Sequence, residues 1–386
     1  MKARLRTVRL RLSEPLRISR STMDAREAVW LTVEHGGLSG HGEAVTSGYY
    51  GLDAQRLGRL LGTACSALAR FPDPESALGV LRAGEPDAGA LDGGELDGVR
   101  GEDVPPAVTA AVESALLDLA GKRAGEPVHR MLGAAEPPCA PTARTIGITG
   151  TAHVAAFAER LVRDGFSVLK LKAGAPDPED DLARVRAVRE RAPHARLLLD
   201  PNGAWSPGEA RRLLPRYAEL GVSAVEQPVP PGDPEGLARL AAASPLPVIA
   251  DEDAVDLEDV RRLAGRVQGV NVKLAKCGGV YAALRIAELA EGSGTGLMLG
   301  CLTASSLGLA PAVHLAHLAE WADLDGHLLL AHDPWEGIGG TDGTVRVSGD
   351  AGLGVREVRP PVPVADLAGS EGDGGAEGGL RHADMA

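Results

Sequence analysis

Aromatic side chains are scarce in this chain of 386 residues: they make up 3% of the sequence, although 44% of the residues are hydrophobic. A large core must therefore be built from aliphatic residues. No stretch approaches the roughly 20 consecutive apolar residues that a membrane-spanning helix needs. The N-terminus also runs directly into alternating residues, without the apolar segment of a signal peptide. These absences predict a soluble protein with no membrane partner.

Cysteine is rare as well, with four residues far apart in the sequence and no CxxC pair: Cys65, Cys139, Cys277 and Cys301. This pattern excludes a disulfide framework and a zinc site, and it predicts reduced thiols in a cytoplasmic protein. The sequence also lacks a P-loop, a GxSxG elbow and an HExxH motif, which argues against the enzyme classes that those motifs mark.

The formal net charge is −13, which argues against nucleic acid as the partner. Much of this charge lies in two Gly-rich segments, residues 85–103 and 365–386, which are nearly free of large apolar side chains. Their composition predicts a solvated loop and a disordered acidic tail. The overall acidity therefore says little about a functional site.

Residues 1–125 have the pattern of an α+β domain. Val8, Leu10 and Leu12 alternate with arginines, as in a half-buried strand, and residues 28–34 and 38–44 follow as further strands. Helical spacing of apolar residues then predicts helices over residues 54–70 and 107–120.

From about Cys139 the rhythm changes to short apolar runs separated by helical segments such as residues 182–191. Eight such units favour a closed (β/α) barrel over residues 126–327, with a doubly wound open sheet as the alternative. Residues 328–364 resemble strands that return toward the first domain. The predicted barrel strands end near Ile148, Lys172, Asp200, Glu226, Asp251, Lys273, Cys301 and Asp325.

Charged residues terminate five successive barrel strands. Asp200, Glu226 and Asp251 would converge at the C-terminal ends of neighbouring strands, and such a set of hard oxygen ligands suits one Mg²⁺ ion. Lys172 and Lys273 would flank that ion from opposite sides of the barrel. Residues two apart in a strand share a face, so Lys170 would point inward beside Lys172.

This arrangement suits the removal of a proton next to a carboxylate. The metal would offset the charge of the enediolate that forms, and a base on each face would remove and return the proton. A lysine base must be neutral, so we expect a second cation, either Lys170 or the metal, to lower its pKa. The predicted outcome is racemisation or epimerisation.

Five local sequences resemble those of the enolase superfamily, specifically the muconate-lactonizing-enzyme subgroup, and the likeness runs from Arg4 to about Val364. It implies a (β/α)₇β modified TIM barrel beneath an N-terminal α+β capping domain, with Asp200, Glu226 and Asp251 binding Mg²⁺ and Lys172 and Lys273 as the acid/base pair. Lys170 and Asn202 would support them, and Lys276 is expected to be structural. The motifs are Leu169-Lys170-Leu171-Lys172, Asp200-Pro201-Asn202-Gly203-Ala204-Trp205, Val225-Glu226-Gln227-Pro228, Ala250-Asp251-Glu252 and residues 271–279.

Asp323 and Asp325 at the end of the last strand are similar to the Asp-x-Asp pair of the dipeptide epimerases in that subgroup. The resemblance implies that they hold the α-ammonium group of a dipeptide. Two carboxylates on one strand face, away from the metal, would suit a cation. The best-known activity of such enzymes is L-Ala-D/L-Glu epimerisation.

In this family the substrate side chains are recognised from the capping domain, which places Arg20, Tyr49 and Tyr50 at the site. Arg20 resembles an arginine that some relatives direct at a terminal Glu, although a surface role is equally compatible with the sequence. Cys301 and Thr303, at the end of the seventh strand, are expected to line the site. No catalytic His accompanies Cys301 in the sequence, so packing is favoured over a nucleophilic role. Ala304 stands where many relatives have Glu, which leaves the identity of the substrate open.

The leading hypothesis is a Mg²⁺-dependent dipeptide epimerase that forms a homo-oligomer. An N-acylamino acid racemase, an o-succinylbenzoate synthase or a cycloisomerase is the first alternative, but these enzymes need no partner for an ammonium group. A non-catalytic binding protein that keeps the barrel is the second alternative.

Overall fold

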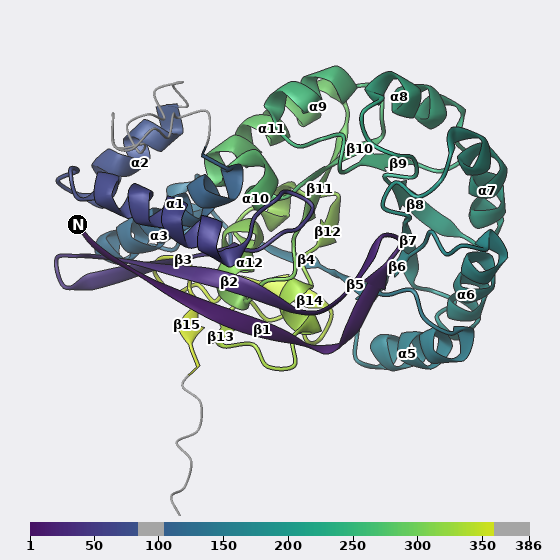
Figure 1. The fold of residues 1–386 in the computed structure, drawn as a ribbon, viewed down its shortest axis with the longest axis horizontal. Coiled ribbons are helices and arrows are strands. Elements are labelled where there is room, and N and C mark those ends of the chain that lie inside the picture. Colours follow the sequence, from purple (N-terminus) through teal and green to yellow (C-terminus); the bar gives the residue numbers. More distant parts are fainter. Residues whose placement is uncertain (84–103, 359–386) are drawn as a thin grey trace, which may run out of the picture.

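The computed structural model describes residues 1–83 and 104–358. The predicted acidic loop and tail, residues 85–103 and 365–386, lie outside these residues. Two β-sheets organise the described chain: a three-stranded antiparallel sheet near the N-terminus and an eight-stranded parallel sheet (Figure 1).

The N-terminal sheet is a long hairpin with a third strand, in the order β1 (Lys2–Ile18), β2 (Ser21–His35) and β3 (Leu38–Val45). Helices α1 (Ala54–Leu68), α2 (Pro74–Ala83), α3 (Pro106–Ala124) and α4 (Val128–Met131) follow. Gly40 and Gly42 allow β3 to approach α3, because a Cβ at either position would lie within about 2.1 Å of a backbone oxygen of α3. The predicted strands and helices of this region are confirmed.

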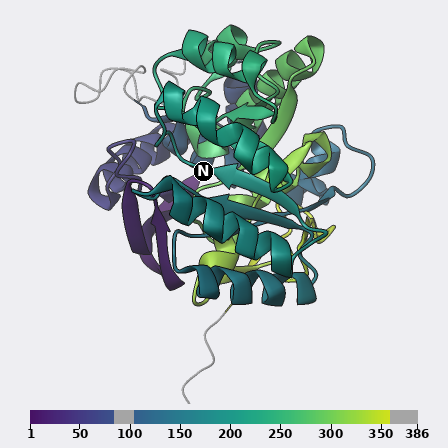
Figure 2. The same cartoon turned by 90° about the vertical axis from the view of Figure 1, so that its right-hand side faces the viewer.

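The parallel sheet alternates strands with helices from β5 to β12. Successive strands are neighbours, and the two end strands meet where the Leu324 amide donates to Thr142 Oγ1 at 2.9 Å. Helices surround the strands (Figures 1 and 2). This is the predicted (β/α)₇β barrel, and the doubly wound alternative is wrong. Its elements are β5 (Ala143–Ile146), α5 (Thr151–Arg163), β6 (Val168–Lys172), α6 (Pro178–Arg191), β7 (Arg196–Asp200), α7 (Pro207–Glu219), β8 (Val222–Glu226), α8 (Pro234–Ala243), β9 (Val248–Ala250), α9 (Leu257–Leu263), β10 (Gly269–Val272), α10 (Leu274–Cys277), α11 (Val280–Ser293), β11 (Gly296–Gly300), α12 (Ser306–Val313) and β12 (Trp321–Asp323).

Local capping explains where several barrel helices begin. Ser206 and Glu209 form a capping box at the start of α7, and Asp256 and Asp259 form one at α9. Proline occupies the first position of α6, α7 and α8, where its missing N–H costs no helical hydrogen bond. These signals set where each of these helices begins after the loop that follows its strand.

The chain beyond β12 contacts its N-terminal part. Ala331 N donates to Arg11 O at 2.9 Å, and β14 (Thr344–Arg346) pairs antiparallel with β4 (Cys139–Pro141). Two short strands, β13 (Trp335–Glu336) and β15 (Arg356–Glu357), pair with each other. Two 3₁₀ helices, η3 (Ala316–Leu318) and η4 (Gly326–Leu329), flank β12.

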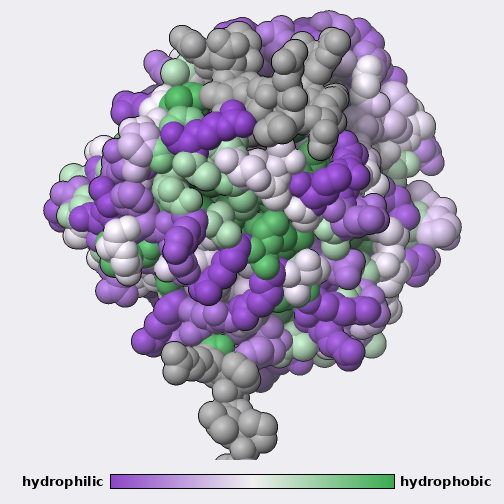
Figure 3. All heavy atoms as spheres, turned by 60° about the vertical axis from the view of Figure 1, so that its left-hand side comes forward, coloured by the Kyte–Doolittle hydropathy of each residue, from purple (hydrophilic) through white to green (hydrophobic). Residues whose placement is uncertain are grey.

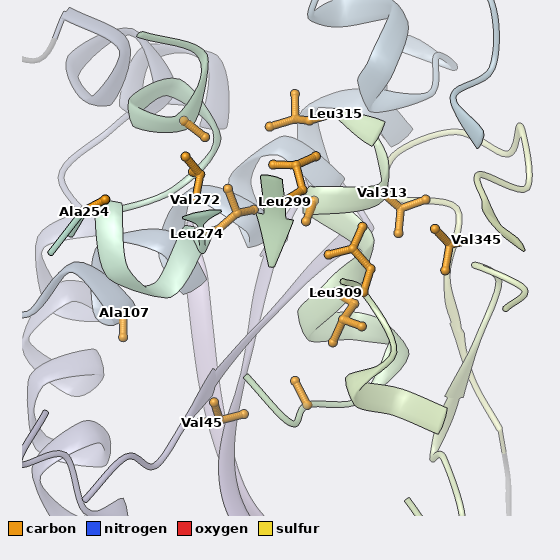
Figure 4. Close-up of a cluster of buried hydrophobic side chains, with 14 of the residues drawn as sticks. Val45, Ala107, Ala254, Val272, Leu274, Leu299, Leu309, Val313, Leu315 and Val345 are labelled. Carbon is orange, nitrogen blue, oxygen red and sulfur yellow. The ribbon is translucent and has the colours of Figure 1, made fainter. Parts of the chain in front are cut away.

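One aliphatic core joins these regions. Val45 and Ala107 from the N-terminal region pack in the same buried cluster as Val272 and Leu299 of the barrel and Val345 of β14 (Figure 4). On the face shown in Figure 3, hydrophobic residues lie in small groups between hydrophilic ones. None of the helices in residues 1–83 and 104–358 is long and apolar enough to cross a membrane.

Candidate active site

A pocket of about 500 Å³ lies between the N-terminal region and the C-terminal ends of the barrel strands. The β1–β2 hairpin extends toward β6 and β7 in Figure 1. Near its tip, Arg17 O accepts a hydrogen bond at 2.8 Å from the backbone N–H of Ile148, which follows β5. Asp200 and Glu226 are buried next to the pocket, 0% and 2% exposed. The other predicted site residues line it: Arg20, Tyr49, Tyr50, Lys170, Lys172, Asn202, Asp251, Lys273, Cys301, Thr303, Asp323 and Asp325.

Lys170 is the centre of the buried charge network. Its Nζ lies 3.1 Å from Asp200 Oδ2, 2.6 Å from Glu226 Oε2 and 2.6 Å from Asp323 Oδ2. The side chain is 1% exposed, so these contacts replace its hydration. Lys170 therefore connects the predicted metal ligands to the predicted ammonium site.

The two predicted bases contact different carboxylates. Lys172 Nζ donates to Asp200 Oδ2 at 2.5 Å, and Lys273 Nζ donates to Asp251 Oδ2 at 2.6 Å. Burial lowers the pKa of Lys273, but the charges of Asp251 and Glu226 raise it more, so its net pKa lies above the usual value. The two carboxylates therefore outweigh the ammonium group of Lys170 here, and the lowered lysine pKa expected beside a bound metal ion stays a prediction.

The three predicted metal ligands are oxygen donors in a buried cluster of charges. Burial, and then the charge of Asp200, raise the pKa of Glu226 to about 8, although Lys170 Nζ lies 2.6 Å from Glu226 Oε2. An ammonium group contacts each of the three carboxylates, and no three acidic, His or Cys side chains among residues 1–83 and 104–358 are grouped so as to hold a metal ion. The donor chemistry nevertheless fits a hard divalent cation.

Asp323 and Asp325 differ in how fully their oxygens are used. Asp325 Oδ2 accepts from Arg144 Nη1 at 3.0 Å and from Thr145 N at 2.6 Å. Asp323 Oδ2 pairs with Lys170, whereas Asp323 Oδ1 is buried without a hydrogen-bond partner in the described chain. Asp323 Oδ1 is therefore available to accept a hydrogen bond from a ligand in the pocket.

Arg20 already has an acidic partner. Its Nη2 donates to Glu252 Oε1 at 2.8 Å and its Nη1 to Asn202 O at 3.0 Å, while the guanidinium lies 4.6 Å from the ring centroid of Tyr49. Glu252 was not predicted from the sequence as the partner of Arg20. The ion pair leaves little net charge at this end of the pocket.

Cys301 is half-buried and lines the pocket. Burial, and then the charges of Asp323 and Asp325, raise the pKa of its thiol, so the thiol stays protonated. This environment agrees with a packing role, and none of the four cysteines forms a disulfide.

A sequence profile described as "Enolase C-terminal domain-like" matches residues 153–358. The hydrophobic dipeptide epimerase of Roseobacter litoralis is 33% identical over 340 residues, which cover 87% of this chain and 93% of that protein. This chain belongs to the enolase superfamily.

Two further enolase-superfamily relatives agree with this assignment. The L-Ala-D/L-Glu epimerase of Bacteroides thetaiotaomicron is 30% identical over 331 residues, covering 86% of this chain and 81% of that protein. A dipeptide epimerase of Enterococcus faecalis, solved in complex with Mg and the dipeptide L-Leu-L-Tyr, superposes with a TM-score of 0.82 at 29% identity, covering 92% of this chain and 98% of that one.

Two residues that sequence reasoning missed support Asp251 in this enolase-superfamily site. Lys276 Nζ donates to Asp251 Oδ1 at 2.6 Å, so Lys276, expected to be only structural, contacts a predicted metal ligand. Gln227 Oε1 accepts from Asp251 N at 3.0 Å, and Gln227 holds a positive φ of 34°. Its place directly after Glu226 at a strand end was the available signal.

Proposed function

We propose that this protein is a Mg²⁺-dependent dipeptide epimerase, an isomerase that moves a proton at the carbon next to the substrate carboxylate. The observation that supports this proposal most is that Lys172, at the end of β6, and Lys273, directly after β10, line one pocket. These strands are four positions apart in the eight-stranded barrel and so lie across it from each other. Two bases so placed can reach opposite faces of one planar intermediate.

Asp200, Glu226 and Asp251 would hold the Mg²⁺ ion. When bound, Mg²⁺ would offset negative charge on the ligands and on the substrate carboxylate, which stabilises the charge that develops at the neighbouring carbon. The raised pKa of Glu226 supports this proposal, because burial and the charge of Asp200 disfavour its ionised form and a divalent cation beside it would favour that form. Lys276 and Gln227 are positioning residues for Asp251.

Lys172 and Lys273 would exchange a proton with the α-carbon of the second residue. One lysine removes the proton as a neutral base, and the other, protonated, delivers a proton to the opposite face. By analogy with the family, Lys172 would serve the L-configured carbon and Lys273 the D-configured carbon. The reverse reaction exchanges their roles, so both epimers are substrates.

Asp323 would accept the substrate's α-ammonium group through Oδ1, with Asp325 fixed behind it by Arg144 and Thr145. The two substrate termini would then be held at opposite ends of the pocket, which sets the length at two residues. This ammonium site is what favours a dipeptide over an N-acylamino acid.

Incubation with a library of free dipeptides in D₂O, followed by mass spectrometry and chiral chromatography, tests the proposal. We expect deuterium at the α-carbon of the second residue together with formation of its epimer. The matched substrates are N-acetyl and N-succinyl amino acids, which lack the ammonium group and should react poorly. A preference for N-succinyl amino acids over every dipeptide would instead favour an acylamino acid racemase.

Other assignments extend this proposal. Residues 1–125 would act as the capping domain and 126–327 as the catalytic barrel, with 328–364 returning to the cap. The contact of Ala331 with Arg11 supports that division. A homo-oligomeric state and a cytoplasmic location also remain proposals.

A further inference from the structure

Arg26 on β2 is a second guanidinium at the pocket, and its partners differ from those of Arg20. It donates to Thr46 O, and its Nη2 lies 3.2 Å from Met23 Sδ. Its Nε is buried without a partner, and no acidic side chain in residues 1–83 and 104–358 pairs with it. Arg26 is thus a pocket cation whose charge no carboxylate of the described chain balances.

Burial of the Arg26 guanidinium costs free energy, because the charge loses contact with water. Desolvation lowers the pKa of Arg26 to about 10, which still leaves the guanidinium protonated at neutral pH. A buried cation is stabilised when an anion pairs with it, and guanidinium binds carboxylates well through its fork of N–H donors. A carboxylate on the substrate would supply the missing partner.

Arg26 and Arg20 serve different sides of the pocket. Arg20 contacts Asn202 and Glu252, which follow β7 and β9. On β2, Arg26 lies five residues beyond Ser21, where the strand begins, which is roughly 17 Å at the usual rise of a strand. It pairs in register with Leu10 of β1.

Arg26 lies within electrostatic reach of Cys301, the residue that directly follows β11, and both line the pocket. Asp323 and Asp325 act on the same thiol. The unpaired arginine therefore lies on the side where the substrate's ammonium group is proposed to bind.

We propose that Arg26 selects dipeptides whose first residue carries a carboxylate, that is, Asp-X and Glu-X. This inference rests on the proposed function: with the α-ammonium at Asp323 and the second residue between Lys172 and Lys273, the first side chain lies on the Arg26 side. An N-succinyl amino acid would carry a similar carboxylate but no ammonium group. The test must therefore distinguish a carboxylate on the first residue of a dipeptide from the carboxylate of an N-succinyl group.

The sharpest test compares two substrates of equal shape on the wild-type protein. L-Glu-L-Leu and L-Gln-L-Leu differ in charge alone, and we expect kcat/KM for epimerisation to favour L-Glu-L-Leu by at least about tenfold, as for a desolvated charge pair. Equal rates, or a preference for L-Gln-L-Leu, would overturn the inference. No deuterium uptake from any dipeptide would overturn the proposed function itself.

Variants then assign the preference to Arg26. Arg26→Met should bring the Glu-to-Gln ratio near one, and Arg26→Lys should restore part of it. Arg20→Met is the matched control, because it removes the pocket guanidinium that already has an acidic partner, and it should change both rates by a similar factor. A ratio that survives in Arg26→Met would contradict the assignment, since a purely structural role would lower both rates together.

N-Succinyl-L-leucine separates the two sources of carboxylate. We expect it to react more slowly than L-Glu-L-Leu. If it reacted faster in the wild type and lost that advantage in Arg26→Met, carboxylate recognition by Arg26 would be supported and the dipeptide assignment overturned.

Discussion

Lys170 Nζ lies 2.6 Å from Asp323 Oδ2, and this contact joins two parts of the site that the sequence suggested separately. The same ammonium group contacts Asp200 and Glu226. Charge at the proposed metal site and charge at the proposed ammonium site are therefore coupled through one buried lysine. A substitution in the proposed metal site should therefore change substrate binding at the ammonium site, and the reverse.

The first prediction concerns the ammonium site. Asp323→Asn should lower kcat/KM for free dipeptides by at least about tenfold, because it removes the charge that pairs with the α-ammonium. Steady-state kinetics with L-Ala-L-Leu measures this effect. N-Acetyl-L-leucine is the matched control. It has no ammonium group to pair with Asp323, so Asp323→Asn should lower its already slow rate by a smaller factor.

Asp325→Asn should act differently. It leaves Arg144 without its buried partner, so the variant should lose stability as well as activity. If Asp325→Asn lowered kcat/KM at unchanged melting temperature while Asp323→Asn had no effect, the roles of the two carboxylates would be reversed.

The second prediction concerns the metal. Treatment with a chelator should abolish epimerisation, and Mg²⁺ should restore it, because the buried carboxylates and the substrate need a divalent charge. Mg²⁺ should also raise the melting temperature of the wild type, by linkage to binding, and should not do so in Asp200→Asn. Full activity without a divalent ion would refute the metal assignment.

The third prediction concerns the two bases. Lys172→Ala and Lys273→Ala should each abolish net epimerisation, because each lysine is proposed to serve one face of the intermediate. One variant should still exchange deuterium into a single epimer, and nuclear magnetic resonance in D₂O measures that exchange separately for each epimer. Wild-type epimerisation in either variant would contradict a two-base mechanism.

The residues at the strand ends were predictable because two simple periodicities place them. Side chains two apart in a strand share a face, and parallel barrel strands end at one rim, so Lys170, Lys172 and Asp200 could be located from spacing alone. The pairing of Arg20 with Glu252 could not be, because it depends on how the hairpin tip meets the loop after β9. The contact of Lys276 with Asp251 could not be predicted from strand spacing, because Lys276 lies in the four-residue helix α10 that follows β10.

The last prediction uses Glu113, a buried carboxyl on α3 that accepts hydrogen bonds from Val280 N and Tyr281 N at the start of α11. Burial raises its pKa from 4.5 to about 8. Between these values the folded state binds the proton and the unfolded state does not. The free energy of unfolding should therefore fall as pH rises from about 5 to 8, by an amount on the order of 3 kcal/mol. Glu113→Gln keeps an acceptor oxygen without a titrating proton. The free energy of unfolding of this variant, measured in urea, should therefore lose that part of the pH dependence. The variant should also be more stable than the wild type at pH 8. An unchanged pH slope in Glu113→Gln would show that other groups cause the dependence.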